Sequence, residues 1–137
     1  MPLVRIDLRR GKPAPYLVAL RNGVYEALRE TFEVPENDRF ILVNQHVADE
    51  FDCDPGYLGI ARGEDLVIVQ IFCANTRGVT QKKALYRCIA AKLAADPGLR
   101  TEDVFINLVE TARENWSFGH GIAQYVAAAV SSPAQGA

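Results

Sequence analysis

The chain has 137 residues, 49% of them hydrophobic and 23% charged, a composition typical of one soluble globular domain. The formal net charge is −2, so nucleic acid is not expected as a partner. No apolar run approaches the length of a membrane span, so a membrane is not expected as a partner either. A cytoplasmic location is expected. The three cysteines have no CxxC spacing and there are only two histidines, which argues against a disulfide framework and a metal centre; no cofactor is expected.

The first half of the chain predicts a strand, a helix and a second strand. Residues 3–8 form a short run rich in β-favouring side chains. Leu20, Val24 and Leu28 lie four residues apart, which places them on one face of a helix. The turn-forming sequence VPEND at 34–38 ends that helix, and residues 40–43 predict the next strand.

The second half predicts the same order of elements. After a turn-rich stretch at 54–59, expected to be a loop or short hairpin, residues 66–73 are nearly all apolar, as in a buried strand. Leu85, Ile89 and Leu93 again form one helical stripe, DPG at 96–98 ends the helix, and residues 104–109 predict a strand. An ordered loop at 114–121, a short helix at 122–130 and a frayed end are expected to follow.

The two halves align without a gap when position 68 is placed on position 3. Leu3, Val4 and Ile6 then align with 68, 69 and 71, both helical stripes coincide, and DRFI at 38–41 aligns with DVFI at 103–106. Each half is therefore a β-α-β unit, because the helix is long enough to return the second strand parallel to the first. We expect one domain, residues 1–137, with units at 1–60 and 61–112 and a C-terminal loop and helix at 113–130.

These units predict an α/β (α+β) fold with a four-stranded mixed sheet and both helices on one face. The opposite face is also expected to be rich in apolar residues, and no third helix of comparable size remains to cover it. Another copy of the chain is the simplest cover for such a face.

The sequence begins Met1-Pro2, which allows two interpretations. A proline at the first residue of a strand costs little, because its missing N–H is not needed there. If Met1 is removed, however, Pro2 becomes a rigid secondary amine that can titrate near neutrality and act as an acid or base.

In combination, MPLVRIDL at the start, the duplicated unit, VPENDRF, NTRGVTQKKALY and NWSFGHG resemble the tautomerase superfamily over residues 2–127. The likeness is greatest to the long-chain members that include malonate semialdehyde decarboxylase. It implies a homotrimer with inward-facing sheets, a catalytic N-terminal proline and a small carboxylate substrate. Val67 matches Pro2 in the second unit and has no free amine, so one active site per chain is expected.

The resemblance also implies roles for the loop that contains Arg77. An arginine there binds the substrate carboxylate, for which guanidinium has matching bidentate geometry; the alternative is a solvated loop arginine. The decarboxylase has Arg-Pro-Arg in this loop, whereas this chain has Asn75-Thr76-Arg77. Asn75 can orient an oxygen but supplies no charge, which argues against decarboxylation.

Three further residues match family positions. Asp38 corresponds to an aspartate near the proline, where it would orient the proline region or water and favour a protonated amine. Asp103 at the matching place in the other unit suggests instead a turn residue that opens a strand. Trp116 and Phe118 correspond to an apolar wall of the site, although packing in the core or an interface would explain them equally well.

Other polar residues carry weaker signals. His46 follows Gln45, a pair that the decarboxylase also has, and a buried structural histidine is expected. Arg9 and Arg10 follow the first strand and are expected to be solvated, although they could reach a neighbouring subunit's site.

Three functions follow from these residues. The leading one is a cofactor-free keto–enol tautomerase, in which Arg77 holds a small 2-oxo acid while Pro2 moves a proton between carbon and oxygen. The alternative is a decarboxylase or hydratase for a 3-oxo acid, with Pro2 protonated. The third is a non-catalytic trimer that binds ligands and keeps Pro2 as a relic of the fold.

Overall fold

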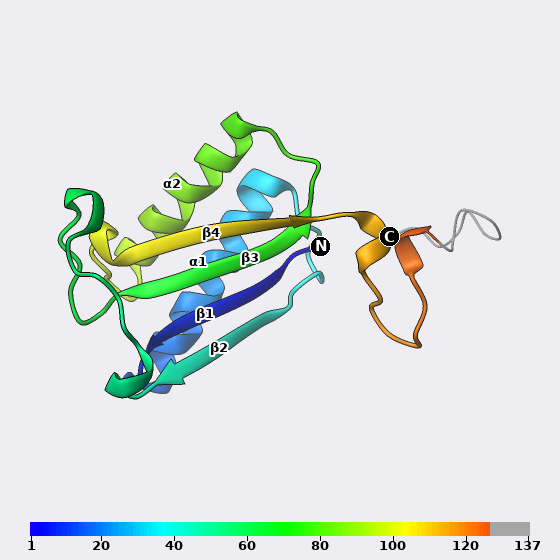
Figure 1. Ribbon diagram of the computed structural model, residues 1–137. Coiled ribbons are helices and arrows are strands. Elements are labelled where there is room, and N and C mark those ends of the chain that lie inside the picture. Colours follow the sequence, from blue (N-terminus) through cyan, green and yellow to red (C-terminus); the bar gives the residue numbers. More distant parts are fainter. Residues whose placement is uncertain (127–137) are drawn as a thin grey trace.

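The computed structural model describes residues 1–126 and shows a four-stranded sheet with two helices on one face, as Figure 1 illustrates. The elements are β1 (Leu3–Arg9), α1 (Ala14–Phe32), β2 (Ile41–His46), β3 (Val67–Ala74), α2 (Val79–Ala95) and β4 (Val104–Thr111). The strand order is β2-β1-β3-β4, with β1 parallel to β2, β3 parallel to β4, and β1 antiparallel to β3. The predicted fold class is confirmed.

The duplication is visible in the strand register. Val4 pairs with Ile41 in the first unit, and the corresponding residues of the second unit, Val69 and Ile106, pair in the same way. Across the central pair of strands, Val4 faces Ile71 and Ile6 faces Val69. Exchanging the two units therefore exchanges these two pairs, and the chain has an internal two-fold axis between β1 and β3.

The core lies between the sheet and the two helices. Alternate residues of β1 and β3 are buried, as expected for strands with one covered face. The predicted helical stripes are buried against them. The helices also pack on each other, and a Cβ on Gly23 would lie 2.7 Å from Cδ2 of Leu93, so only glycine fits at this approach without a shift.

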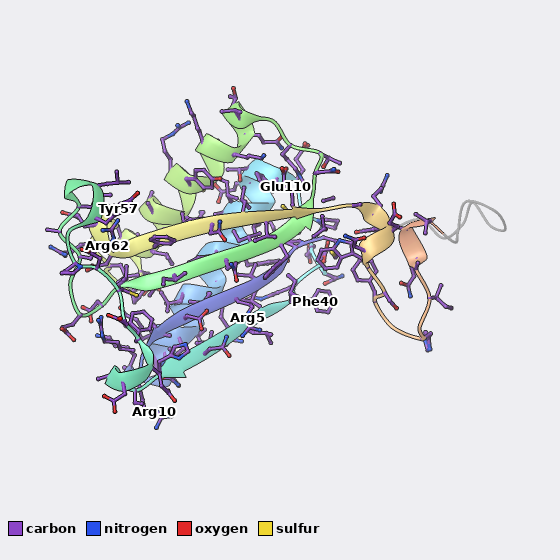
Figure 2. The ribbon with its side chains drawn as sticks, in the orientation of Figure 1. Arg5, Arg10, Phe40, Tyr57, Arg62 and Glu110 are labelled. Carbon is purple, nitrogen blue, oxygen red and sulfur yellow. The ribbon has the colours of Figure 1, made fainter. Side chains whose placement is uncertain are left out.

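The other face of the sheet carries no helix within residues 1–126, but it is less apolar than the sequence indicates. Leu42 and Phe105 are 49% and 43% exposed on it. Polar side chains alternate with the apolar ones, and Nε2 of Gln70 donates to Oδ1 of Asn107 at 2.9 Å across neighbouring strands. Arg5, labelled in Figure 2, pairs with Leu42 and therefore lies on the same face. The face is therefore a mixed surface.

Element ends account for the remaining differences. β2 begins one residue later and ends three residues later than predicted, because its pairing with β1 continues to His46. Residues 57–59 form a 3-10 turn and not a hairpin. Of the helix predicted at 122–130, residues 124–126 are helical, and 127–130 lie outside the described residues. None of the helices in the described part of the chain is long and apolar enough to cross a bilayer.

Candidate active site

The start of the chain and Asp38 meet at one end of the sheet. Pro2 is buried directly before β1, and Asp38 lies in a turn that precedes β2. Because β1 and β2 are parallel, the residues before them lie at the same edge. The α-amino nitrogen of Met1 lies 3.1 Å from Oδ2 of Asp38, and both side chains are largely buried.

Arg77 lies in the loop between β3 and α2, and the end of α1 fixes its orientation. Its Nη2 donates to the carbonyl oxygen of Phe32 at 2.8 Å, and its Cζ lies 4.7 Å from the centre of the Phe32 ring. A guanidinium has five N–H groups, so this contact leaves it able to donate to a ligand as well. Asn75 is exposed in the same loop.

The thiol of Cys73, near the end of β3, is affected by burial and by the charges at this end of the sheet. Burial raises the pKa of its thiol, while the Arg77 guanidinium and, more weakly, the N-terminal ammonium oppose the rise. Because β3 is antiparallel to β1 and Phe72 pairs with Leu3, the loop after β3 lies where β1 begins. The chain start, Asp38 and Arg77 therefore lie at the same end of the sheet.

An aromatic wall continues this region beyond β4. Nε1 of Trp116 donates to Oγ1 of Thr111 at 2.7 Å, and that hydroxyl donates to the carbonyl oxygen of Cys73 at 3.3 Å. The Trp116 and Phe118 rings stack with centroids 5.6 Å apart. In Figure 1 the segment after β4 continues past the end of the sheet at which the N-terminus lies. The structure thus brings the predicted aromatic residues to the same end as Asp38 and Arg77.

Tyr125 and Arg113 were missed by the sequence reasoning. The Tyr125 ring meets the edge of Phe118 at 5.0 Å between centroids, and Cζ of Arg113 lies 5.3 Å from its centre. Burial and the Asp38 carboxylate raise the pKa of the Tyr125 hydroxyl, whereas Arg113 and Arg77 lower it. The recurrence of aromatic residues at 116, 118 and 125 was the only signal in the sequence that could have pointed to Tyr125.

His46, Arg9 at the end of β1 and Arg10 after it lie at the opposite end of the sheet. Nε2 of His46 lies 2.7 Å from Oδ1 of Asp7, and Cζ of Arg9 lies 4.8 Å from the centre of the Phe51 ring. Figure 2 shows Arg10 far from Phe40, which lies between Asp38 and β2 in the chain. Within one chain, these residues are therefore separate from the candidate site.

Two other features do not coincide with the site. Within residues 1–126, no three His, Cys, Asp or Glu side chains come together to form a possible metal site. An open groove lies between α1 and the edge strand β2, lined by apolar residues including Leu17, Val18 and Ile41. Its lining includes neither Arg77 nor a residue of the aromatic wall.

The sequence profile of a family described as tautomerase enzyme matches residues 38–119, more than half of the chain. The chain belongs to the tautomerase family. This tautomerase is 40% identical over 126 residues to the probable tautomerase YusQ of Bacillus subtilis, a match that covers 92% of this chain and 99% of the relative.

Solved structures extend the likeness to decarboxylases. A malonate semialdehyde decarboxylase with decarboxylase and hydratase activities is 31% identical, with a TM-score of 0.84 over 90% of this chain and 95% of that one. The FG41 malonate semialdehyde decarboxylase inhibited by 3-bromopropiolate is 33% identical, with a TM-score of 0.85 over 96% and 99%. A fused 4-OT trimer, 18% identical with a TM-score of 0.72 over 88% and 94%, shares the fold. This tautomerase is thus an isomerase-type enzyme with decarboxylase relatives.

Proposed function

We propose that this tautomerase interconverts the keto and enol forms of a small 2-oxo acid, with the Pro2 amine, freed by removal of Met1, as the proton carrier. The observation that carries the proposal is the position of Pro2. It is buried, it directly follows the Met1 α-amino group that lies 3.1 Å from Oδ2 of Asp38, and it lies at the end of the sheet that also holds Arg77. Removal of Met1 would leave the Pro2 amine one residue from this contact, with a carboxylate close by and a cation suited to a carboxylate substrate.

The reaction needs one proton to move. The neutral Pro2 amine takes a proton from C3 of the 2-oxo acid, and the electrons of the broken C–H bond form the C2–C3 double bond while charge develops on the carbonyl oxygen. The protonated amine then returns the proton to that oxygen, which gives the enol. Arg77 holds the carboxylate, and the hydroxyl of Tyr125 is suited to donate to the oxygen on which charge develops.

Asp38 and the aromatic wall serve this proton transfer indirectly. The Asp38 carboxylate orients the amine and stabilises its protonated form after the first step. Trp116 and Phe118 keep water away from the reacting carbon, so that the abstracted proton returns to the substrate.

A decarboxylase or hydratase is the second candidate, and the two solved decarboxylases support it. In a 3-oxo acid, loss of CO₂ breaks the C–C bond and leaves its electrons on the carbonyl oxygen, which a protonated Pro2 would stabilise. The uncharged Asn75 weighs against this candidate, because it leaves Arg77 as the one cation in residues 75–78 for a carboxylate.

Proton NMR in D₂O distinguishes the two candidates. With phenylenolpyruvate, we expect accelerated conversion to the keto form with deuterium at C3; with malonate semialdehyde, we expect little CO₂ release. The reverse pattern would assign the decarboxylase function. No acceleration with either substrate would remove the support for proton transfer at Pro2.

We also propose that the open sheet face is buried in a homotrimer, for which the trimeric fused 4-OT proteins of the same fold give support. Sedimentation should show a species of three times the 15.1 kDa chain mass. Phe105→Asp should dissociate it, because a carboxylate buried without a partner is costly. Val79→Asp, at an exposed apolar residue on α2, is the matched control and should stay trimeric. A monomeric wild-type protein would contradict the proposed assembly.

A further inference from the structure

The internal two-fold axis gives the charged residues of the candidate site counterparts at the other end of the sheet. In the gap-free alignment of the two units, Asp103 corresponds to Asp38 and Lys12 corresponds to Arg77. Asp103 directly precedes β4, and Asp38 lies three residues before β2. Each cation lies two residues before the helix of its unit. The chain therefore keeps a second copy of this arrangement.

Asp103 is engaged by the chain itself. The backbone N–H of Gly63 donates to its Oδ1 at 2.7 Å, and Nε of Arg100 lies 3.2 Å from its Oδ2. Asp103 is only 3% exposed. A backbone N–H thus occupies on Asp103 the place that the α-amino group of Met1 occupies on Asp38.

Lys12 is bound by Asp65, two residues after Gly63. Its Nζ lies 2.7 Å from Oδ1 of Asp65, so the counterpart of Arg77 already binds a carboxylate. The hydrogen bond with Asp65 raises the pKa of the Lys12 ammonium, against a smaller opposing effect of burial.

The backbone of residues 61–65, which contain Gly63 and Asp65, is also held by hydrogen bonds from other parts of the chain. Nη2 of Arg100 donates to the carbonyl oxygen of Ala61 at 2.8 Å, and Nη1 of Arg9 donates to that of Glu64 at 3.1 Å. In Figure 2, Arg62 lies at the end of the sheet opposite to Phe40, as the two-fold axis requires.

We propose that residues 61–65 are an internal ligand that fills a second, degenerate copy of the site, with the Gly63 N–H in the amine position on Asp103 and the Asp65 carboxylate in the substrate position on Lys12. This second copy uses these groups to hold the chain together, and the Asp65 carboxylate competes with small carboxylates for Lys12. Its role goes beyond the function proposed for Pro2.

The matched pair Asp103→Asn and Asp38→Asn tests the structural half of the proposal. Asp103→Asn should lower Tm by on the order of 5–10 °C, because a buried charge-assisted hydrogen-bond network is lost. Asp38→Asn, at the equivalent position, should lower Tm by less than half as much. Equal shifts for the two variants would overturn the assignment of different roles.

Hydrogen exchange on the unmodified protein tests the same contact even if Asp103→Asn fails to fold. The Gly63 amide should exchange at least about 100-fold more slowly than a fully exposed amide, since the segment must open before exchange. Exchange at the exposed rate would show that Gly63 does not occupy Asp103 in solution.

Malonate titration tests the carboxylate half. In Asp65→Asn, the Lys12 and Ala14 NMR signals should shift at malonate concentrations about two- to five-fold lower than in wild type, the range expected when a surface ion pair no longer competes. The double variant Lys12→Gln/Asp65→Asn should lose this response. Equal responses of Asp65→Asn and wild type would show that Asp65 does not fill this position. None of these readouts depends on turnover at Pro2.

Discussion

Replacing Pro2 with Ala should lower kcat/KM for enolisation by about 10²–10⁴-fold, the usual contribution of a general acid–base group. The variant keeps an N-terminal primary amine beside Asp38, so some activity should remain. What is lost is the rigid ring that fixes the nitrogen and the basicity of a secondary amine.

The control is Pro13→Ala, which changes an exposed proline at the start of α1 and should leave turnover unchanged. The direction of the pH profile gives a second readout. With Pro2 as a base, kcat/KM rises with pH as the amine loses its proton; with Pro2 as an acid, it falls over the same range. Wild-type turnover by Pro2→Ala on every substrate tried would mean that proline opens the chain for structural reasons alone.

Replacing Arg77 with Ala should cost about 1.5–3 kcal/mol in kcat/KM for a carboxylate substrate, the range for a hydrogen bond to a charged group. Arg77→Lys should recover part of the loss, since lysine keeps the charge and loses the bidentate geometry. Arg87→Ala, at an exposed arginine on α2, is the control and should have no effect.

The contact between Arg77 and the Phe32 carbonyl means that Arg77→Ala should also lower Tm slightly. A substrate ester separates binding from stability, because it lacks the carboxylate that Arg77 is proposed to hold. Arg77→Ala should lose activity on the acid and keep it on the ester. Equal losses on both, or a large fall in Tm with kcat/KM intact, would make Arg77 a structural residue.

Much of the fold could be predicted from the sequence because its periodicity is strong and repeated. The stripe of Leu20, Val24 and Leu28 and its copy at 85, 89 and 93 define the helices, and the gap-free alignment of the two halves defines the two units. The mixed character of the open face was harder to see. Gln70 lies in a nearly continuous apolar run, and its pairing with Asn107 depends on strand register.

The candidate site was only partly predictable, for a physical reason. Pro2, Asp38 and Arg77 lie at the same end of the sheet because β1 and β2 begin there and β3, antiparallel to β1, ends there, so topology alone brings them to one end. Tyr125 is placed by contacts within an irregular segment, such as that with Phe118, which no periodicity encodes. Likewise, Asp103 was recognisable as a counterpart of Asp38, but its partner Gly63 lies far back along the chain in a loop.

Catalysis by a free Pro2 amine is tested by the intact mass of the catalytically active protein. We expect a chain that lacks Met1 and begins at Pro2, because a retained methionine would convert the proline nitrogen into a peptide amide. A protein that retains Met1 in full and still turns over phenylenolpyruvate at the undiminished rate would contradict it.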